Sequence, residues 1–296
     1  MRLLSLVCHV RPERPATLPP HLGRAAHAAL LRLLHEADPS LAAHLHDDDG
    51  PKPFTCTSLV GPRGRAGEVE PHQRYWLRFT ALNDAVAHAL DAWARGGSQQ
   101  VELDGVAFAV EEIARTPAQH PWAAESTYEE LAARWLIPRS SSEEAAQGVP
   151  WRIGLQFTTP TAFRSGGKQI PVPLPDLVFG SLVERWNAYA PITLAEEARR
   201  YGAECVAISR YALRSRAVGY KESAIKVGAT GECWYSALNR DRYWLAALNL
   251  LADFAFWSGV GTQTAIGMGQ VRRLRSAEHQ TWPLSDARRV HSQAKA

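Results

Sequence analysis

Side chains that could act on a phosphate group lie close together in the first third of the chain. His46 and Lys52 stand six residues apart on either side of an aspartate-rich turn, so both could reach a single site. Histidine exchanges protons near neutral pH and can serve as a general acid or base, and lysine supplies a cation for charge that develops on phosphate. Metal-free cleavage of an RNA backbone needs these functions. The alternative is a solvated loop in which aspartates cap turns.

The same stretch has two other interpretations. His44 competes with His46 for a catalytic role, but a separation of two residues turns the side chains in different directions on a helical turn. The run Asp47-Asp48-Asp49 offers the hard oxygen ligands that suit Mg²⁺. Consecutive residues diverge in a strand or turn, however, and no second carboxylate cluster stands out. We therefore expect no metal site and no cofactor.

A third histidine, His27, lies on the flank of a predicted helix. The apolar residues of 21–37 recur on one face, and at about 100° per residue His27 falls beside that face, next to Arg24 and Leu31. A lone histidine there is more often a boundary residue than a catalyst. Six others are interpreted as surface residues: His21, His35, His72, His88, His120 and His279.

A glycine-rich segment near the C-terminus follows an apolar, helix-like run. Its four glycines fall within eleven residues: Gly259, Gly261, Gly267 and Gly269. Glycine accepts positive φ angles and the close approach of other atoms, and a turn with exposed N–H groups can cradle a phosphate. A tight helix-to-strand connection would need the same glycines.

The charge of the chain is divided unevenly. Residues 1–148 have 14 Lys and Arg against 19 Asp and Glu, a net charge of −5, whereas residues 149–296 have 19 against 11, a net charge of +8. The basic half is where a polyanion would bind. It contains two groups of candidate RNA contacts, the pair Arg164 and Lys168, and the set Arg210, Arg214 and Arg216 with Lys221 and Lys226 beyond.

Even-numbered spacing places Arg210, Arg214 and Arg216 on one face of a regular strand. An ordinary solvated strand face is the alternative.

The composition is typical of a globular, soluble chain, with 46% hydrophobic and 21% charged residues. The longest apolar stretch, 243–260, is interrupted by Asn249 and Asp253, which favours a buried helix over a membrane span. The four cysteines are widely separated and form no CxxC pair, which argues against a zinc site. Free thiols favour a reducing cytoplasm.

The hydrophobic pattern predicts an α+β protein of two tandem ferredoxin-like (RRM-like) domains with the order βαββαβ. In the first half, strands are expected at 2–10, 54–60, 75–80 and 106–113 and helices at 21–37 and 84–93, the second capped by Asn83. In the second half, strands are expected at 151–158, 206–214, 232–237 and about 270–274 and helices at 175–189 and from 241. The predicted domains are 1–138 and 150–275, with 119–148 as a connector and 276–296 as a polar tail.

Three separated segments resemble one protein family. The spacing GxGxxxxxGxG of 259–269, after an aromatic helix, is similar to the C-terminal glycine-rich loop of the RAMP superfamily of CRISPR-associated RNA-binding proteins. The segment 161–164, Thr-Ala-Phe-Arg, resembles the Ser/Thr-Pro-Thr-x-Phe-Arg segment of pre-crRNA-processing endoribonucleases. In these enzymes a histidine also follows the first helix, just before an acidic turn and a strand opening with Pro-Phe, and His46 occupies that position. The resemblance covers nearly all of residues 1–275.

This resemblance implies a metal-independent endoribonuclease that cuts CRISPR repeat RNA and leaves a 2′,3′-cyclic phosphate or 3′-phosphate and a 5′-hydroxyl. Some members use two histidines nineteen residues apart, which matches His27 and His46, with Lys52 neutralising the phosphorane. The basic residues and glycines named above would bind RNA. The product could pass to a CRISPR interference complex, and the enzyme would act as a monomer or homodimer. The alternative is a non-catalytic RNA-binding subunit of a CRISPR effector, because such proteins share the glycine-rich loop.

Overall fold

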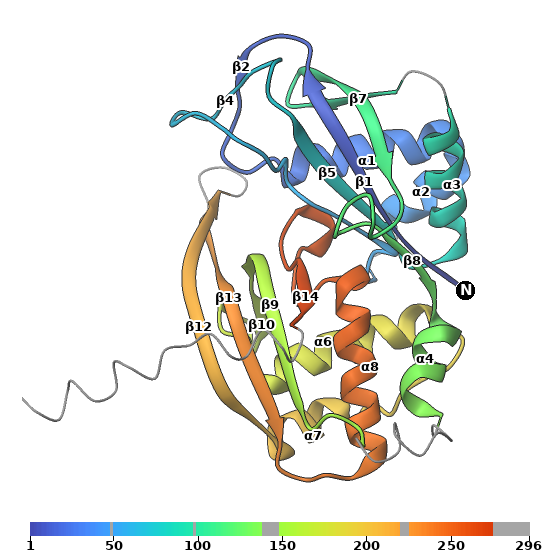
Figure 1. Cartoon of the computed structure of the whole chain (residues 1–296), viewed down its shortest axis with the longest axis vertical. Coiled ribbons are helices and arrows are strands. Elements are labelled where there is room, and N and C mark those ends of the chain that lie inside the picture. Colours follow the sequence, from blue (N-terminus) through green and yellow to red (C-terminus); the bar gives the residue numbers. More distant parts are fainter. Residues whose placement is uncertain (48–49, 97–98, 138–147, 220–224, 275–296) are drawn as a thin grey trace, which may run out of the picture.

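Two antiparallel sheets with the same strand order form the frame of the molecule. The computed structural model describes residues 1–47, 50–96, 99–137, 148–219 and 225–274. Its first sheet has the order β3-β5-β1-β7-β6 and its second the order β12-β13-β9-β14. Counting the four main strands of each unit, the second, third, first and fourth lie side by side, which confirms the predicted pair of ferredoxin-like domains. Figure 1 shows the first unit above the second.

The first unit has two helices on one face of its sheet. Its elements are β1 (Arg2–Pro12), β2 (Ala16–Thr17), α1 (Gly23–Ala37), α2 (Pro39–Asp47), β3 (Phe54–Cys56), β4 (Glu68–Val69), β5 (Tyr75–Ala81), α3 (Asp84–Arg95), β6 (Gln100–Leu103), β7 (Val106–Ala114) and β8 (Ala124–Thr127). Alternate side chains of β1 point to opposite faces. Those of Leu4 and Leu6 therefore pack with Leu30 of α1 and Leu90 of α3 in one core.

The second unit repeats this plan with a longer hairpin. Its elements are α4 (Tyr128–Leu136), β9 (Arg152–Thr161), β10 (Phe163–Ser165), β11 (Lys168–Ile170), α6 (Pro175–Tyr189), α7 (Ala198–Cys205), β12 (Val206–Gly219), β13 (Ile225–Ala237), α8 (Arg242–Ser258), the 3-10 turn η2 (Thr264–Ile266) and β14 (Val271–Arg273). The apolar run expected to be a buried helix is α8, and Phe254 packs there with Trp186. Within the described ranges, no helix is both long and apolar enough to cross a membrane.

Two regions expected to be irregular contain regular structure. The histidine- and aspartate-rich loop after α1 begins as α2, because Asp38 Oδ1 accepts hydrogen bonds from the N–H groups of Ser40 and Leu41, both at 3.0 Å. Pro39, at the first position, fits a helix start because it has no N–H to satisfy. An aspartate cap followed by proline is a helix signal, so this helix could have been predicted.

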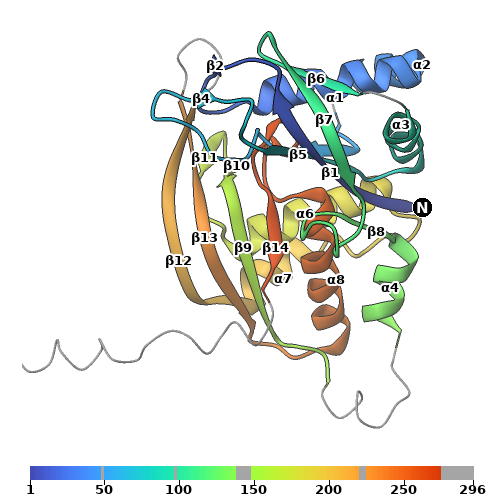
Figure 2. The same cartoon turned by 45° about the horizontal axis from the view of Figure 1, so that its top comes forward.

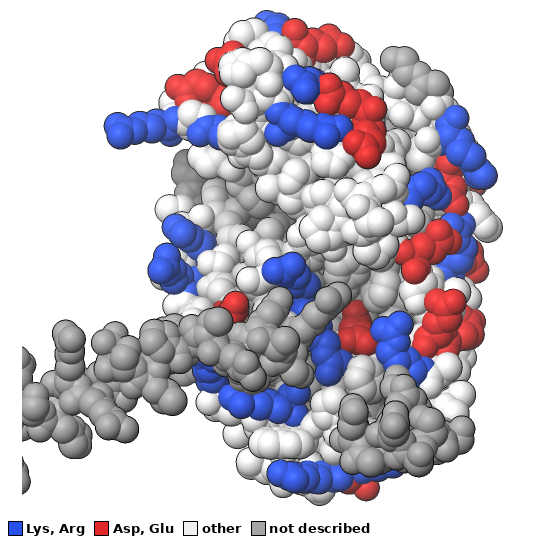
Figure 3. All heavy atoms as spheres, in the orientation of Figure 1, with Lys and Arg blue, Asp and Glu red and all other residues white. Residues whose placement is uncertain are grey.

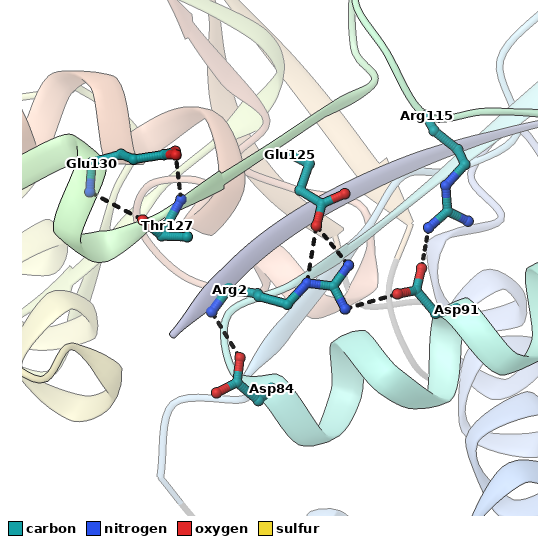
Figure 4. Close-up of polar contacts among 7 residues, drawn as sticks. All are labelled: Arg2, Asp84, Asp91, Arg115, Glu125, Thr127 and Glu130. Atoms are coloured by element: carbon teal, nitrogen blue, oxygen red, sulfur yellow. Dashed lines mark hydrogen bonds and ion pairs between the residues drawn. The ribbon is translucent and has the colours of Figure 1, made fainter.

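The predicted connector is the second such region, because it contains β8 and α4. Thr127 and Glu130 form a capping box, in which Glu130 N donates to Thr127 Oγ1 (3.0 Å) and Thr127 N donates to Glu130 Oε2 (3.1 Å), as Figure 4 shows. Tyr128 and Leu131 of α4 are buried in the core that α6 and α8 complete. The linker-like residues 138–147 lie outside the described residues, as does the polar tail, and the domain limits stay a prediction.

Two arginines of the first unit, Arg2 and Arg115, are bound to carboxylates. Arg2 lies 2.8 Å from Asp91 and 2.7 Å from Glu125, and Arg115 pairs with the second oxygen of Asp91 (Figure 4). The backbone N–H of Arg2 donates to Asp84 at 2.8 Å. Partly exposed ion pairs contribute only about 0–1 kcal/mol each. Their consequence here is that these arginines are not free to bind a polyanion.

The second face of the first sheet is polar and buried against the C-terminal end of α8. Thr80 Oγ1 donates to the carbonyl of Trp257 at 3.0 Å, and Arg78 Nη2 donates to the carbonyl of Phe256 at 2.6 Å. The last carbonyls of a helix lack partners within the helix and carry the negative end of its dipole. The first unit therefore caps the helix that leads into the glycine-rich segment of the second.

Arg78 is the central residue of this junction. It is fully buried, and it forms no ion pair with a carboxylate among the described residues. Its Nε donates to Ser5 Oγ (2.8 Å) and its Nη1 to Gln270 Oε1 (2.6 Å), while the guanidinium lies 4.5 Å and 4.9 Å from the ring centroids of Phe256 and Trp122. Burial lowers the pKa of Arg78 to about 9, so the side chain is still charged at neutral pH.

Candidate active site

The glycine-rich segment 259–269 lies between the two units, where the trace is drawn in red beyond α8 in both Figure 1 and Figure 2. All four of its glycines have φ between 63° and 90°, the left-handed region that side chains rarely adopt. The space is closed as well, because a Cβ at Gly261 would meet the carbonyl oxygen of Ala162 at 2.4 Å. The glycines are therefore required by the shape of the segment.

The amide groups of three of these glycines are already used. Gly259 N donates to the carbonyl of Ala255 (3.0 Å), Gly261 N to Ser181 Oγ (3.2 Å), and Gly269 N to the carbonyl of Pro160 (3.1 Å). These three N–H groups are therefore not exposed to a phosphate in this structure, and RNA binding by the glycines stays a prediction. Carbonyl groups of the segment in turn accept hydrogen bonds from the first unit and from α6.

Helix α1 of the first unit docks directly on this segment. Gly23 is its first residue, and a Cβ there would lie 1.8 Å from the carbonyl oxygen of Ile266. Two histidines bind neighbouring carbonyls of η2, His21 through Nε2 to Ile266 (3.1 Å) and His27 through Nδ1 to Ala265 (3.0 Å). The first unit thus supplies imidazoles and the second unit holds them in place.

The contact with Ala265 fixes the proton of His27. A carbonyl oxygen only accepts hydrogen bonds, so Nδ1 of His27 must carry the hydrogen. The neutral imidazole then has its lone pair on Nε2, the nitrogen on the far side of the ring. The ring also packs 5.5 Å from that of Phe54, which restricts its rotation. This half-buried side chain is oriented as a proton acceptor.

Further residues hold the carbonyl of Ala265 in position. The thiol of Cys56 donates to it at 2.9 Å, and burial raises the pKa of this thiol, so it stays protonated. Gln270 Nε2 in turn donates to the carbonyl of Cys56 at 3.3 Å, while Gln270 Oε1 accepts from Arg78. A line of hydrogen bonds therefore runs from the buried arginine of the junction to His27.

His46 lies in the last turn of α2, and Lys52 follows five residues after the helix ends. Lys52 Nζ donates to the carbonyl of Leu45 at 2.7 Å, where a cation interacts favourably with the helix terminus. The backbone of His46 belongs to α2, but its side chain lies outside the described part of the structure, as do those of His44 and Asp47 and the whole of Asp48 and Asp49. The catalytic roles assigned to His46 and Lys52 stay predictions.

The predicted RNA contacts divide between two faces of the second unit. Arg164 and Lys168 are exposed on the β10–β11 hairpin, and Arg164 lines an open pocket beside the glycine-rich segment. Arg210, Arg214 and Arg216 lie on β12, on the sheet face opposite the core. The register confirms that they share this face, because they pair regularly with Trp234, Thr230 and Gly228 after a bulge near 208–210. The tip of this hairpin, with Lys221, lies outside the described residues.

Sequence reasoning missed several residues of this region. His21 was assigned to the surface, yet it is half-buried against η2, and burial lowers its pKa. The signal that could have predicted its burial is its position two residues before Gly23, where α1 begins. Arg185 and Gln263 were missed too. Of the other histidines, His35, His72 and His88 are exposed as expected, whereas His120 is half-buried against His9 and Trp76. His279 lies outside the described residues. Among the described residues, no group of three or more His, Cys, Asp or Glu side chains could hold a metal ion.

Comparisons with known proteins agree on one family. A family model described as CRISPR Cas6 N-terminal domain matches residues 3–133, and one described as CRISPR-associated endoribonuclease Cas6 matches residues 155–271. A CRISPR-associated endoribonuclease Cas6 of Mycobacterium tuberculosis is 31% identical over 130 residues, which are 41% of this chain and 38% of that protein. The aligned stretch thus spans less than two-fifths of the relative.

Solved structures of this family are similar over almost the whole chain. A Cas6 (TTHB231) product complex is 28% identical with a TM-score of 0.73, covering 92% of this chain and 100% of that one. A Cas6 (TTHA0078) product complex is 26% identical with a TM-score of 0.71, covering 93% and 100%. The structure named Thermus thermophilus Cas6 (TTHB231) is 27% identical with a TM-score of 0.68, covering 92% and 98%.

Proposed function

Because the chain belongs to the Cas6 family of CRISPR-associated endoribonucleases, we propose that it cleaves precursor CRISPR RNA within its repeats. Two similar structures are Cas6 product complexes, which supports RNA cleavage here. The observation that carries the proposal is His27, whose Nδ1 is bound by a carbonyl of the opposite unit so that Nε2 can accept a proton. A subunit that only binds RNA would not need an imidazole oriented in this way.

The reaction we propose is an attack within the RNA itself. His27 Nε2 takes the proton of a 2′-hydroxyl, and the oxygen forms a bond to the adjacent phosphorus. The bond from phosphorus to the 5′-oxygen breaks, and that oxygen takes a proton from His46. The products are a 2′,3′-cyclic phosphate and a 5′-hydroxyl. The Lys52 ammonium stabilises the charge on the phosphorane. These side chains cover base, acid and cation, so no metal ion is assigned a role.

Cleavage by histidine variants tests the function directly. The substrate is a synthetic repeat RNA, whose sequence is taken from the ends of small RNA that co-purifies with the protein. We expect His27→Ala and His46→Ala each to lower the single-turnover cleavage rate by ~10²–10⁴-fold, while RNA affinity stays within about twofold of wild type. His88→Ala, on an exposed face of α3, is the matched control. Unchanged cleavage in both variants, or its loss with EDTA in the wild type, would contradict the proposal.

The assignment of base and acid needs a separate experiment. In an RNA whose bridging 5′-oxygen at the cut is replaced by sulfur, the leaving group no longer needs a proton. We expect this RNA to restore cleavage by His46→Ala and not by His27→Ala. The opposite pattern would exchange the two roles without affecting the proposed function. Transfer of the product to an interference complex, a monomeric or dimeric state and a cytoplasmic location stay predictions.

A further inference from the structure

An open pocket of about 650 Å³ lies on the helix side of the second unit, next to the candidate active site. One wall is the glycine-rich segment at Gly261–Gln263, two residues before the carbonyl that holds His27. Another is Gly50–Pro51, between the end of α2 and Lys52. The pocket therefore adjoins both parts of the predicted catalytic group. Its volume lies in the range of sites for small organic ligands, about 300–1,000 Å³.

The pocket is positively charged. Three arginines and one glutamate line it, so the net charge of its lining is +2. Arg199 is paired with Glu184 at 2.5 Å. Arg185 donates instead to the carbonyls of Gly259 and Gly261, and it forms no ion pair with any of the described residues. Arg164 is exposed at the opposite rim. Arg164 and Arg185 thus carry charges that no ion pair in the described ranges neutralises.

The side-chain amide oxygen of Gln263, which lines the pocket, is covered and has no hydrogen-bond partner among the described residues. The backbone of Gln263 is in the left-handed conformation with φ 61°, which is uncommon outside glycine. A buried acceptor without a donor costs about 1–3 kcal/mol, and residues held in such conformations cluster at functional sites. The terminal amide rotates over a broad range, so it can turn toward a ligand in the pocket.

We propose that this pocket binds one unstacked nucleotide of the RNA beside the cut, and that Gln263 reads its base. Arg164 and Arg185 hold the flanking phosphates as charge-assisted donors. The Gln263 amide oxygen accepts an N–H from the edge of the base, and the amide N–H₂ donates to the neighbouring acceptor. The inference rests on the proposed function, because it places the nucleotide next to His27. It makes Gln263 a specificity-determining residue.

Binding of single nucleotides tests the pocket apart from cleavage. The probes are the 3′,5′-bisphosphates of adenosine, cytidine, guanosine and uridine, which carry a phosphate on each side of the nucleoside. We expect the whole protein to bind one of the four about tenfold more tightly than the weakest, as one amide–base pair allows. Gln263→Gly and Gln263→Met should lose this preference but keep binding all four. Glycine accepts φ 61°, so that variant removes the side chain without strain.

Two comparisons complete the test. Arg164→Gln should weaken all four bisphosphates by a similar factor, and Gln100→Leu, at an exposed position of β6, should leave binding unchanged. Equal binding of the four by the wild type, or a preference that survives in both Gln263 variants, would overturn the pocket proposal even if RNA is cut. A preference that Gln263 controls, in a protein that cuts no RNA, would uphold the pocket and overturn the proposed function.

Discussion

The two units share one strand order but differ in how the arginines along their sheets are paired. In the first unit Arg2, Arg74 and Arg115 are paired with carboxylates. In the second unit, Arg214 and Arg216 of β12 form no ion pair with any residue that the structure describes. Figure 3 shows the difference, with blue and red spheres side by side on the upper unit and mainly blue along the left edge of the lower. Because an arginine without a carboxylate partner keeps its charge available, we expect the second unit to bind a polyanion more strongly than the first.

The two units also differ in the segment that follows the second helix of each. In the first unit α3 ends at Gly96, which has φ −59°, and the chain soon enters β6. In the second, α8 leads into the glycine-rich segment, which extends to α1 and β3 of the first unit through contacts such as that of His27 with Ala265. The segment after α3 therefore leads to the next strand, whereas the segment after α8 forms part of the candidate active site.

The largest effect is expected where the units meet. Arg78→Met leaves Gln270 Oε1 and the carbonyl of Phe256 without their donor. Each buried, unsatisfied acceptor costs about 1–3 kcal/mol, so we expect a loss of about 3 kcal/mol in the free energy of unfolding, measured by urea denaturation. Arg74→Met is the matched control, because its ion pairs are exposed and worth about 0–1 kcal/mol. Equal losses in the two variants would refute this view of the junction.

The next effect tests the close contact of α1 with η2. Alanine favours helices more than glycine by about 1 kcal/mol, so Gly23→Ala should stabilise α1 taken alone. Its Cβ, however, would lie 1.8 Å from the carbonyl oxygen of Ile266 and push His27 from its position. A displacement of this kind can lower a rate by about 10²-fold, and we expect that loss in the single-turnover cleavage assay. Gly219→Ala, where a Cβ meets nothing within 4 Å, should cleave like the wild type.

A smaller effect would sharpen the comparison of charge. Each phosphate contact contributes about 0.7–0.9 to the slope of log affinity against log salt. We expect the double variant Arg214→Gln, Arg216→Gln to lower that slope by about 1.5 and the affinity for repeat RNA by about tenfold. The control changes two paired arginines of the first unit, Arg32→Gln with Arg74→Gln. A similar change of slope in the control would show that both units bind the RNA backbone.

The smallest effect is a dependence of stability on pH. Burial holds the pKa values of His9, His21 and His120 below their ordinary value of 6.5. As the pH falls through 6.5, the unfolded chain binds protons that the folded protein does not, so stability is lost; at higher pH both states are neutral. We expect the Tm to fall between pH 7.5 and 5.5 and the fall to be shallower in His21→Gln. His88→Gln should follow the wild type, and an identical slope in His21→Gln would contradict the prediction.

Local signals in the sequence were sufficient for most elements of both units. Helix α6 has the predicted bounds, 175–189, because Pro175 fits the first position of a helix, and Asn83 caps α3 as expected by accepting from Val86 N at 2.9 Å. Helix α2 and the capping box of α4 carried similar signals that were not used. Asp38-Pro39 predicts the start of α2, and Thr127 with Glu130 predicts the capping box of α4.

The candidate site was predictable in part. The type and spacing of His27 and the four glycines pointed to this region, but their roles depend on contacts between residues more than 200 positions apart, such as His27 with Ala265. No periodicity encodes which carbonyl an imidazole will meet. For the same reason His21 was assigned to the surface, and Arg78 was not considered, because a charged residue on a strand gives no sign that a distant helix will end against it.

The core of the second unit takes side chains from both ends of the chain. Leu3 of β1 and Leu131 of α4 pack there with residues of α8 and β14, such as Phe254 and Val271. During translation the first unit leaves the ribosome well before α8 is made. Leu3 and α4 therefore lack their packing partners until α8 has been synthesised, so we expect the core of the second unit to close only after translation of α8 and β14.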